Sequence, residues 1–244
     1  MSEFNTYTSF IGEVLIYGSR HIRGFKSHPK YNYVLEHVPK HQGEEYLCHV
    51  PPTISIESVK EFCLLNDKFG DPKKEDFRFG KASPTSLRYV VHATIILSYL
   101  QSGGWMAPDI VEVGGGYGGL YLAIRFFAPQ YGIRIASYTL VDLKEPLKLQ
   151  KIYLSKHLAD TNVDFVEADT FGKDIPRTDM FLISNYCFSS LEKNLQEQYQ
   201  QHLFPKVAHG FMAWNKTEPF DFGFPFRSET EYPLTANGNK YLFF

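Results

Sequence analysis

The chain has 244 residues, enough for one large domain or one domain with an appendage, and its 43% hydrophobic content supports a substantial core. A formal net charge of −2 shows no basic excess of the kind that nucleic-acid binding requires, and no apolar run is long enough for a membrane span. Cys48, Cys63 and Cys187 lack CxxC spacing, and the first residues lack a signal peptide pattern. We therefore expect reduced thiols and a cytoplasmic protein.

Residues 1–82 predict a helical extension or cap that precedes the main domain. A serine, histidine and proline open a short helix over 27–38, and a serine caps a second helix over 55–69. Between them, residues 39–52 contain three prolines and a glycine, which predict loops. The charged segment 71–76 is expected to be exposed.

Residues 83–244 predict an α/β domain. Ser83 followed by Pro84 is typical of a helix start, and this helix should end near Gln101. Strand-like and helical segments then alternate, which favours parallel strand pairing with right-handed crossovers. The expected strands are 110–113, 136–143, 163–168, 180–184 and 210–214, and the expected helices are 120–128, 144–159 and 191–207.

The C-terminal part differs from this alternation. Two strand-like runs, 227–235 and 240–244, flank an Ala-Asn-Gly-Asn sequence at 236–239. Asn-Gly between strand-like runs predicts a β-hairpin. The fold class is therefore a doubly wound, Rossmann-like, mainly parallel sheet that ends in an antiparallel hairpin.

The most informative stretch runs from Ile110 to Leu120 and joins a strand to a helix through glycines. Such a turn brings a ligand close to the main chain at a helix N-terminus. The spacing Gly114-x-Gly116-x-x-Gly119 satisfies the dinucleotide pattern, whereas Glu112-x-Gly114-x-Gly116-x-Gly118 satisfies that of S-adenosylmethionine (SAM) methyltransferases.

Three acidic residues favour the second interpretation. Glu112, Asp142 and Asp169 each end one of three successive predicted strands. A carboxylate next to the glycines would repel a pyrophosphate, but it suits a cationic sulfonium ligand. Asp142 occupies the position at which a carboxylate binds ribose hydroxyl groups.

Four runs extend this pattern into a family resemblance. They are SPTSLRY at 83–89, VEVGGGYGGL at 111–120, YTLVDLKEP at 138–146 and ISNYCFSSL at 183–191. Together they resemble the sugar O-methyltransferases within the class I SAM-dependent superfamily, over roughly residues 80–215. The resemblance implies a seven-stranded methyltransferase sheet, SAM as cofactor with S-adenosylhomocysteine (SAH) as product, and a sugar or glycan acceptor, free, nucleotide-linked or within an oligosaccharide. The match departs after Asn215, where a loop replaces the expected helix.

The expected cofactor site lies at the carboxyl ends of the strands. Its candidate residues are Arg88, Glu112, Gly114, Gly115, Gly116, Tyr117, Gly118, Asp142, Leu143, Asp169, Thr170 and Ser184. The catalytic candidates are His21, Asn185, Tyr186 and Asp221. No paired carboxylates follow the fourth strand, so we expect no metal.

Several alternatives remain open on the sequence. Asn185 could cap the following helix, and Arg88 could be an ordinary surface arginine. The chain could methylate another small molecule, act as an NAD-dependent oxidoreductase, or bind SAM or a partner without turnover.

Overall fold

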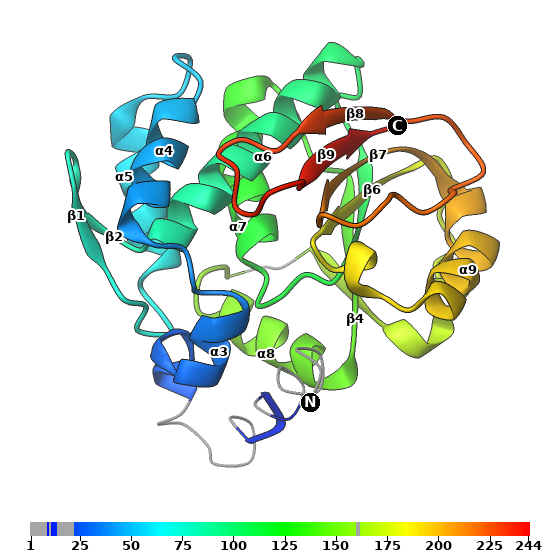
Figure 1. Ribbon diagram of the computed structural model, residues 1–244, viewed down its shortest axis with the longest axis horizontal. Helices are drawn as coiled ribbons and strands as arrows, with labels where there is room; N and C mark the ends of the chain where they lie inside the picture. Colours follow the sequence, from blue (N-terminus) through cyan, green and yellow to red (C-terminus); the bar gives the residue numbers. More distant parts are fainter. Residues whose placement is uncertain (1–8, 10, 14–21, 160–161) are drawn as a thin grey trace.

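The computed structural model describes residues 9, 11–13, 22–159 and 162–244, and its centre is a seven-stranded sheet (Figure 1). The strand order is β5-β4-β3-β6-β7-β9-β8. The strands are β3 (Asp109–Val113), β4 (Ser137–Asp142), β5 (Val163–Glu167), β6 (Met180–Asn185), β7 (Val207–Trp214), β8 (Arg227–Thr230) and β9 (Lys240–Phe243). The first five are parallel, and β9 runs antiparallel between β7 and β8. The predicted fold class is confirmed.

Side chains alternate between the two faces of the sheet, as the strand period requires. Ile110 and Leu140 join one core, while Val111 and Val141 join the other. The first core lies under α6 (Pro84–Ser102), α7 (Gly119–Phe127) and α8 (Lys144–Ser155), and the second under α9 (Lys193–His202). Figure 1 shows α6 and α7 on one side of the sheet and α9 on the other. No helix among the described residues is long and apolar enough to cross a membrane.

The segment before α6 contains more regular structure than predicted. It forms α3 (Pro29–Val34), α4 (Lys40–His49), α5 (Ile56–Asn66) and a small antiparallel hairpin of β1 (Glu75–Phe77) and β2 (Gly80–Ala82). The predicted loop over 39–52 is wrong, because α4 occupies most of it. Gly43 lies buried within this helix, where it packs against Phe77 and Pro84. A domain boundary at residue 82 stays a prediction, since residues from both sides share one apolar cluster.

The C-terminal hairpin is present, but its connection is longer than predicted. The strand β8 ends at Thr230, and residues 231–239 lead to β9. Glu231 shapes this loop, since its Oε2 accepts hydrogen bonds from the backbone N and the hydroxyl of Thr235, at 2.8 and 2.6 Å. Trp214, the last residue of β7, pairs with Lys240, the first residue of β9. The loop 231–239, which precedes β9, therefore lies at the carboxyl edge of the parallel strands.

Candidate functional site

The glycine turn connects β3 to α7 in a backbone conformation that other residues rarely adopt. Gly114, Gly116 and Gly118 have φ values of +79°, +57° and +94°. The turn is held by hydrogen bonds from Gly114 N to Val141 O at 2.9 Å and from Gly118 N to Gly115 O at 2.8 Å. A Cβ atom added at Gly114 would lie 2.3 Å from the Sγ of Cys187. Both the geometry and the space therefore require glycine here.

Glu112 precedes this turn, and its carboxylate is almost completely buried, with 2% exposed. The hydroxyl of Tyr138 donates a 2.7 Å hydrogen bond to Glu112 Oε2. The pKa of Glu112 is raised to about 7, mainly by burial. The hydrogen bond from Tyr138 lowers this pKa, and the nearby Asp142 raises it. The carboxylate is thus poised to lose its proton when a cation binds beside it.

Asp142 ends β4 beside the same turn. Its Oδ1 accepts from Leu143 N and its Oδ2 from Gln150 Nε2, both at 2.8 Å. Gln150 Nε2 also donates to Gly116 O at 3.1 Å, so one amide ties the carboxylate to the glycine turn. Burial raises the pKa of Asp142 to about 7. Gln150 is not among the site residues predicted from the sequence, because only the apolar positions of α8 follow a recognisable pattern.

The end of the third strand is more open. Asp169 lies in a short 3-10 helix, Ala168–Thr170, and its side chain is exposed. The hydroxyl of Thr170 donates to Glu167 O at 3.1 Å. Because β5 is parallel to β4, Asp169 lies at the same edge as Asp142, as expected.

Ser184 and Asn185 end β6 and serve different purposes. Ser184 Oγ donates to Val113 O at 2.8 Å, which joins β6 to β3, and it accepts from the backbone N of Phe188 at 3.1 Å. The short helix Phe188–Ser190 begins after Cys187 and has no side-chain cap. Asn185 is therefore not the capping residue. Its Nδ2 lies 3.0 Å from Nδ1 of His92 on α6, and its Oδ1 is buried with no hydrogen-bond partner among the described residues.

Tyr186 has a φ of +60°, which is uncommon for a bulky residue and is found at strained functional positions. Its hydroxyl donates a hydrogen bond to Oε1 of Glu231, in the loop 231–239. The Arg88 guanidinium lies 5.9 Å from the centre of the Tyr186 ring. The sequence contains no signal for the pairing with Glu231, because the two residues are 45 positions apart.

Two candidate cofactor residues direct their side chains into the extension. Arg88 is buried, and its Nη2 donates to Leu35 O at 2.8 Å. The hydroxyl of Tyr117 accepts from Asn66 Nδ2 at 3.1 Å. Leu35 also lies 3.3 Å from where a Gly116 Cβ would be. The extension therefore packs against the glycine turn, and the side chain of Tyr117 is buried against the extension.

Of the remaining catalytic candidates, one cannot be placed and the other lies away from this edge. His21 lies outside the described residues. Asp221 is exposed, its Oδ1 accepts from Gly223 N at 3.0 Å, and its carbonyl accepts from Gln200 near the C-terminal end of α9. Within the described part of the chain, no group of three or more His, Cys, Asp or Glu residues could hold a metal ion.

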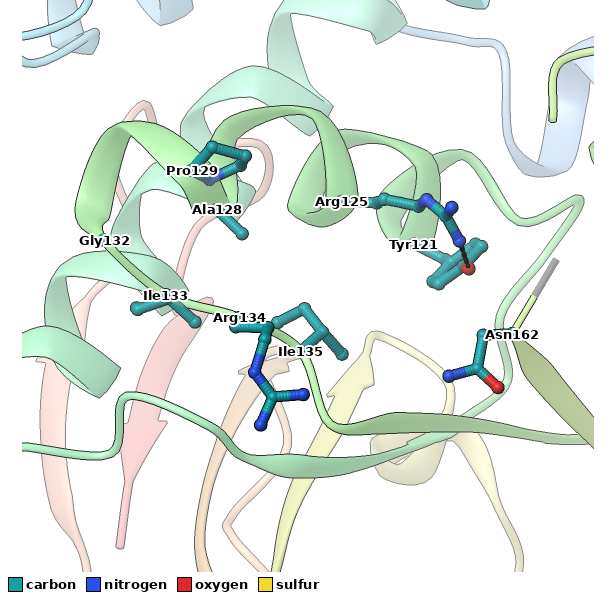
Figure 2. A pocket seen from close by; sticks show the side chains of 9 residues that line it. All are labelled: Tyr121, Arg125, Ala128, Pro129, Gly132, Ile133, Arg134, Ile135 and Asn162. Atoms are coloured by element: carbon teal, nitrogen blue, oxygen red, sulfur yellow. Dashed lines mark hydrogen bonds between the residues drawn. The ribbon is translucent and has the colours of Figure 1, made fainter. Parts of the chain in front are cut away.

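A surface cavity lies elsewhere, at the end of α7 and the segment that follows it (Figure 2). It has a volume of ≈ 580 Å³ and includes none of the candidate site residues. The candidate site is therefore identified from the chemistry of its residues and not from this cavity.

Comparison with known proteins gives a family and a set of similar folds. Residues 75–216 match the sequence profile of the O-methyltransferase domain, and no curated protein matches the chain. An O-methyltransferase family protein from Burkholderia thailandensis is 14% identical, with a TM-score of 0.43 over 63% of this chain and 56% of that one. Magnesium protoporphyrin IX methyltransferase from Synechocystis PCC 6803 with bound SAH is 13% identical, with a TM-score of 0.46 over 65% and 83%. The methyltransferase domain of bacterial CtHen1 is 13% identical, with a TM-score of 0.48 over 62% and 96%.

Proposed function

The chain belongs to the O-methyltransferase domain family, and we propose that it transfers a methyl group to a hydroxyl of a sugar or glycan. The cofactor is SAM, which supplies an electrophilic methyl group and leaves as SAH. This assigns the glycine spacing to SAM and not to a dinucleotide. The glycine turn and the acidic residues at the strand ends support this proposal.

The residues at the glycine turn fit SAM. The bare backbone of Gly114 and Gly116 admits a ligand close to the main chain. In this proposal Glu112 faces the ammonium group and Asp142 accepts hydrogen bonds from the ribose hydroxyls. Both carboxylates can accept further hydrogen bonds, since each oxygen has two lone pairs. Leu35, which directly follows α3, lies close to Gly116 on one side of the turn.

One observation supports a hydroxyl acceptor more than any other, namely the arrangement of Tyr186 and Glu231. Because the Tyr186 hydroxyl donates its proton to Glu231, its oxygen keeps lone pairs that accept a hydrogen bond. An acceptor hydroxyl can donate to this oxygen, which orients its own lone pair toward the methyl group. Asn185 next to it offers an unpartnered carbonyl oxygen for a second hydroxyl. A sugar carries several hydroxyl groups that can make such contacts.

The test is methyl transfer from SAM to a panel of monosaccharides, nucleotide sugars and oligosaccharides, with SAH release as the readout. We expect SAH with at least one member of the panel and none with its matched deoxy sugar. Tyr186→Phe should lower kcat about tenfold while the Kd for SAM stays unchanged. If SAM binds but no sugar, free or linked, yields SAH, the proposed acceptor is wrong.

A further inference from the structure

A buried histidine on α6 contacts the end of β6, and the methyl transfer described above gives it no role. His92 is 1% exposed, and its Nδ1 lies 3.0 Å from Nδ2 of Asn185, the last residue of β6. This contact joins a helix on one face of the sheet to the carboxyl end of a strand, although the two residues are 93 positions apart. It therefore ties α6 to the residues that are proposed to bind the acceptor.

The contact defines which ring nitrogen of His92 carries the proton. An amide nitrogen has two hydrogens and no free lone pair, so Asn185 Nδ2 donates and Nδ1 of His92 accepts. The imidazole is then neutral, with its single proton on Nε2, because an imidazolium ion has no acceptor nitrogen. Burial lowers the pKa of His92 to about 3, and the positive charge of Arg88 lowers it further. The accepting form of the ring is thus the stable form at neutral pH.

Three tyrosines from three other segments fix the plane of this ring. The rings of Tyr46 on α4 and Tyr241 on β9 meet the imidazole edge to face, with centres 6.1 and 5.8 Å away. The Tyr186 ring lies 5.9 Å away, at an angle of 48°. Because Tyr46 and Tyr241 are fully buried, the imidazole cannot turn without displacing close-packed rings. Nδ1 is therefore held at one position beside Asn185.

The contact also decides which end of the Asn185 amide stays free. An asparagine amide has two orientations that exchange its nitrogen and its oxygen. A neighbouring atom that only accepts favours the orientation in which the nitrogen faces it, and the oxygen then needs another donor. Asn185 Oδ1 is buried and has no hydrogen-bond partner within the described ranges of the chain. A buried oxygen without a donor costs about 1–3 kcal/mol, which a hydroxyl group of a bound ligand would recover.

We propose that His92 is a positioning residue that holds the amide of Asn185, so that its oxygen accepts a hydrogen bond from a second hydroxyl of the acceptor. This inference rests on the proposed function, in which Tyr186 receives the hydroxyl that is methylated. The protein then selects acceptors that carry a second hydroxyl near the methylated one. An acceptor without this hydroxyl leaves the buried oxygen unpaired and binds more weakly.

Two substitutions separate the accepting nitrogen from the packing of the ring. His92→Phe keeps an aromatic ring but has no acceptor, whereas His92→Asn keeps an amide oxygen near the position of Nδ1 and removes most of the ring. We expect His92→Phe to raise the KM for the acceptor about tenfold and to leave the Kd for SAM unchanged. His92→Asn should keep this KM within about threefold, although the cavity that it leaves lowers Tm. A purely structural role predicts the reverse order, since phenylalanine preserves the packing.

The effect of His92→Phe should depend on the second hydroxyl of the acceptor. With a deoxy acceptor that keeps the methylated hydroxyl and lacks the second one, His92→Phe should not raise KM, because no hydrogen bond remains to be lost. His209→Phe is the matched control and should leave KM unchanged. His209 is half-buried near the amino end of β7 and stacks on Trp105, with ring centres 3.9 Å apart. The inference is overturned if His92→Phe leaves KM unchanged for the complete acceptor, or if His92→Asn raises it equally.

A measurement on the free protein keeps the failure of this inference distinct from that of the proposed function. With ¹⁵N-labelled histidine, NMR should show the His92 ring with Nδ1 unprotonated and Nε2 protonated at pH 7 and at pH 5, and these signals should be missing from His92→Phe. A protonated Nδ1 in a chain that methylates a sugar would overturn the inference and leave the proposed function intact. An unprotonated Nδ1 in a chain that methylates no sugar would overturn the proposed function, and with it the hydroxyl assigned to Asn185.

Discussion

Burial of two carboxylates at the glycine turn has opposite effects on folding and on cofactor binding. Burial raises the pKa of both Glu112 and Asp142 to about 7. A folded-state pKa above the ordinary value means that the folded chain keeps protons that the unfolded chain releases. The stability that these protons provide is complete below about pH 4 and is lost as the pH rises through 7.

Glu112→Gln should therefore stabilise the protein in alkaline solution. Glutamine mimics the protonated carboxyl group and can still accept from Tyr138. The gain in unfolding free energy at pH 8 should reach about 3 kcal/mol, from a shift in pKa of about 2.5 units, and should vanish at pH 4. Urea denaturation at both pH values measures it. Equal stability of the two proteins at pH 8 would contradict a buried, charged Glu112.

The same protonation should make SAM binding dependent on pH. The charged form of Asp142 accepts ribose hydroxyls, so protons compete with SAM below pH 7. We expect the Kd for SAM to rise as the pH falls from 7 to 5, and Asp142→Asn to weaken binding at least tenfold and to remove the contribution of this carboxylate to the dependence. Isothermal titration measures both. Asp76→Asn, an exposed change on β1, is the control and should behave as the unmodified chain.

At the scale of elements, α4 shows how packing can override local preference. Gly43 lies within this helix, and an added Cβ would lie 2.8 Å from Cζ of Phe77 and 3.0 Å from Cβ of Pro84. Helix propensity alone favours alanine over glycine by about 1 kcal/mol. We expect Gly43→Ala instead to lower the unfolding free energy by about 1–2 kcal/mol, as overpacking does. Gly12→Ala, where nothing lies within 4 Å, is the control for urea denaturation. A stabilised Gly43→Ala would show that α4 does not pack so closely.

The difference between local preference and packing also explains which elements the sequence could predict. Ser55 and Ser83 cap α5 and α6 as predicted, because capping depends on neighbouring residues. The strands were found from their apolar runs, and the glycine turn from its spacing. The region of α4 was predicted to be a loop because the reason for Gly43 lies in other elements. The contact between Tyr186 and Glu231 likewise depends on a loop closed far along the chain.

At the scale of the whole molecule, a buried lysine joins the extension to the glycine turn. Lys26 is fully buried, and its Nζ donates to Asn66 O at 2.7 Å. The same Nζ lies 4.2 Å from the centre of the Tyr117 ring and 4.8 Å from that of Tyr153. Burial lowers the pKa of Lys26 to about 8, although Glu36 and Asp67 act in the opposite direction. The extension is therefore held against the cofactor side by a charged group in an aromatic environment.

This lysine predicts how stability changes in alkaline solution. The folded-state pKa of about 8 lies below the ordinary value of 10.5, so the cost of the buried charge is complete below pH 8 and falls as the pH rises to 10.5. Lys26→Met removes this contribution. The difference in unfolding free energy between the unmodified chain and Lys26→Met should change in favour of the unmodified chain by about 3 kcal/mol across that interval. Burial raises the pKa values of Tyr117 and Tyr153 well above the ordinary value of 10, so these tyrosines stay protonated in the folded chain over this interval. The protons that they release on unfolding are common to both proteins.

The matched control is Lys60→Met, which removes an exposed lysine from α5 of the same extension. Its difference curve should stay flat between pH 8 and pH 10.5, because an exposed ammonium group has no burial cost to lose. Urea denaturation at a series of pH values measures all three proteins. Parallel curves for the unmodified chain and Lys26→Met would mean that Lys26 reaches solvent and does not join the extension to the glycine turn. If the difference in unfolding free energy changes with pH for Lys26→Met alone, Lys26 is buried as described and its burial contributes to the stability of the whole chain.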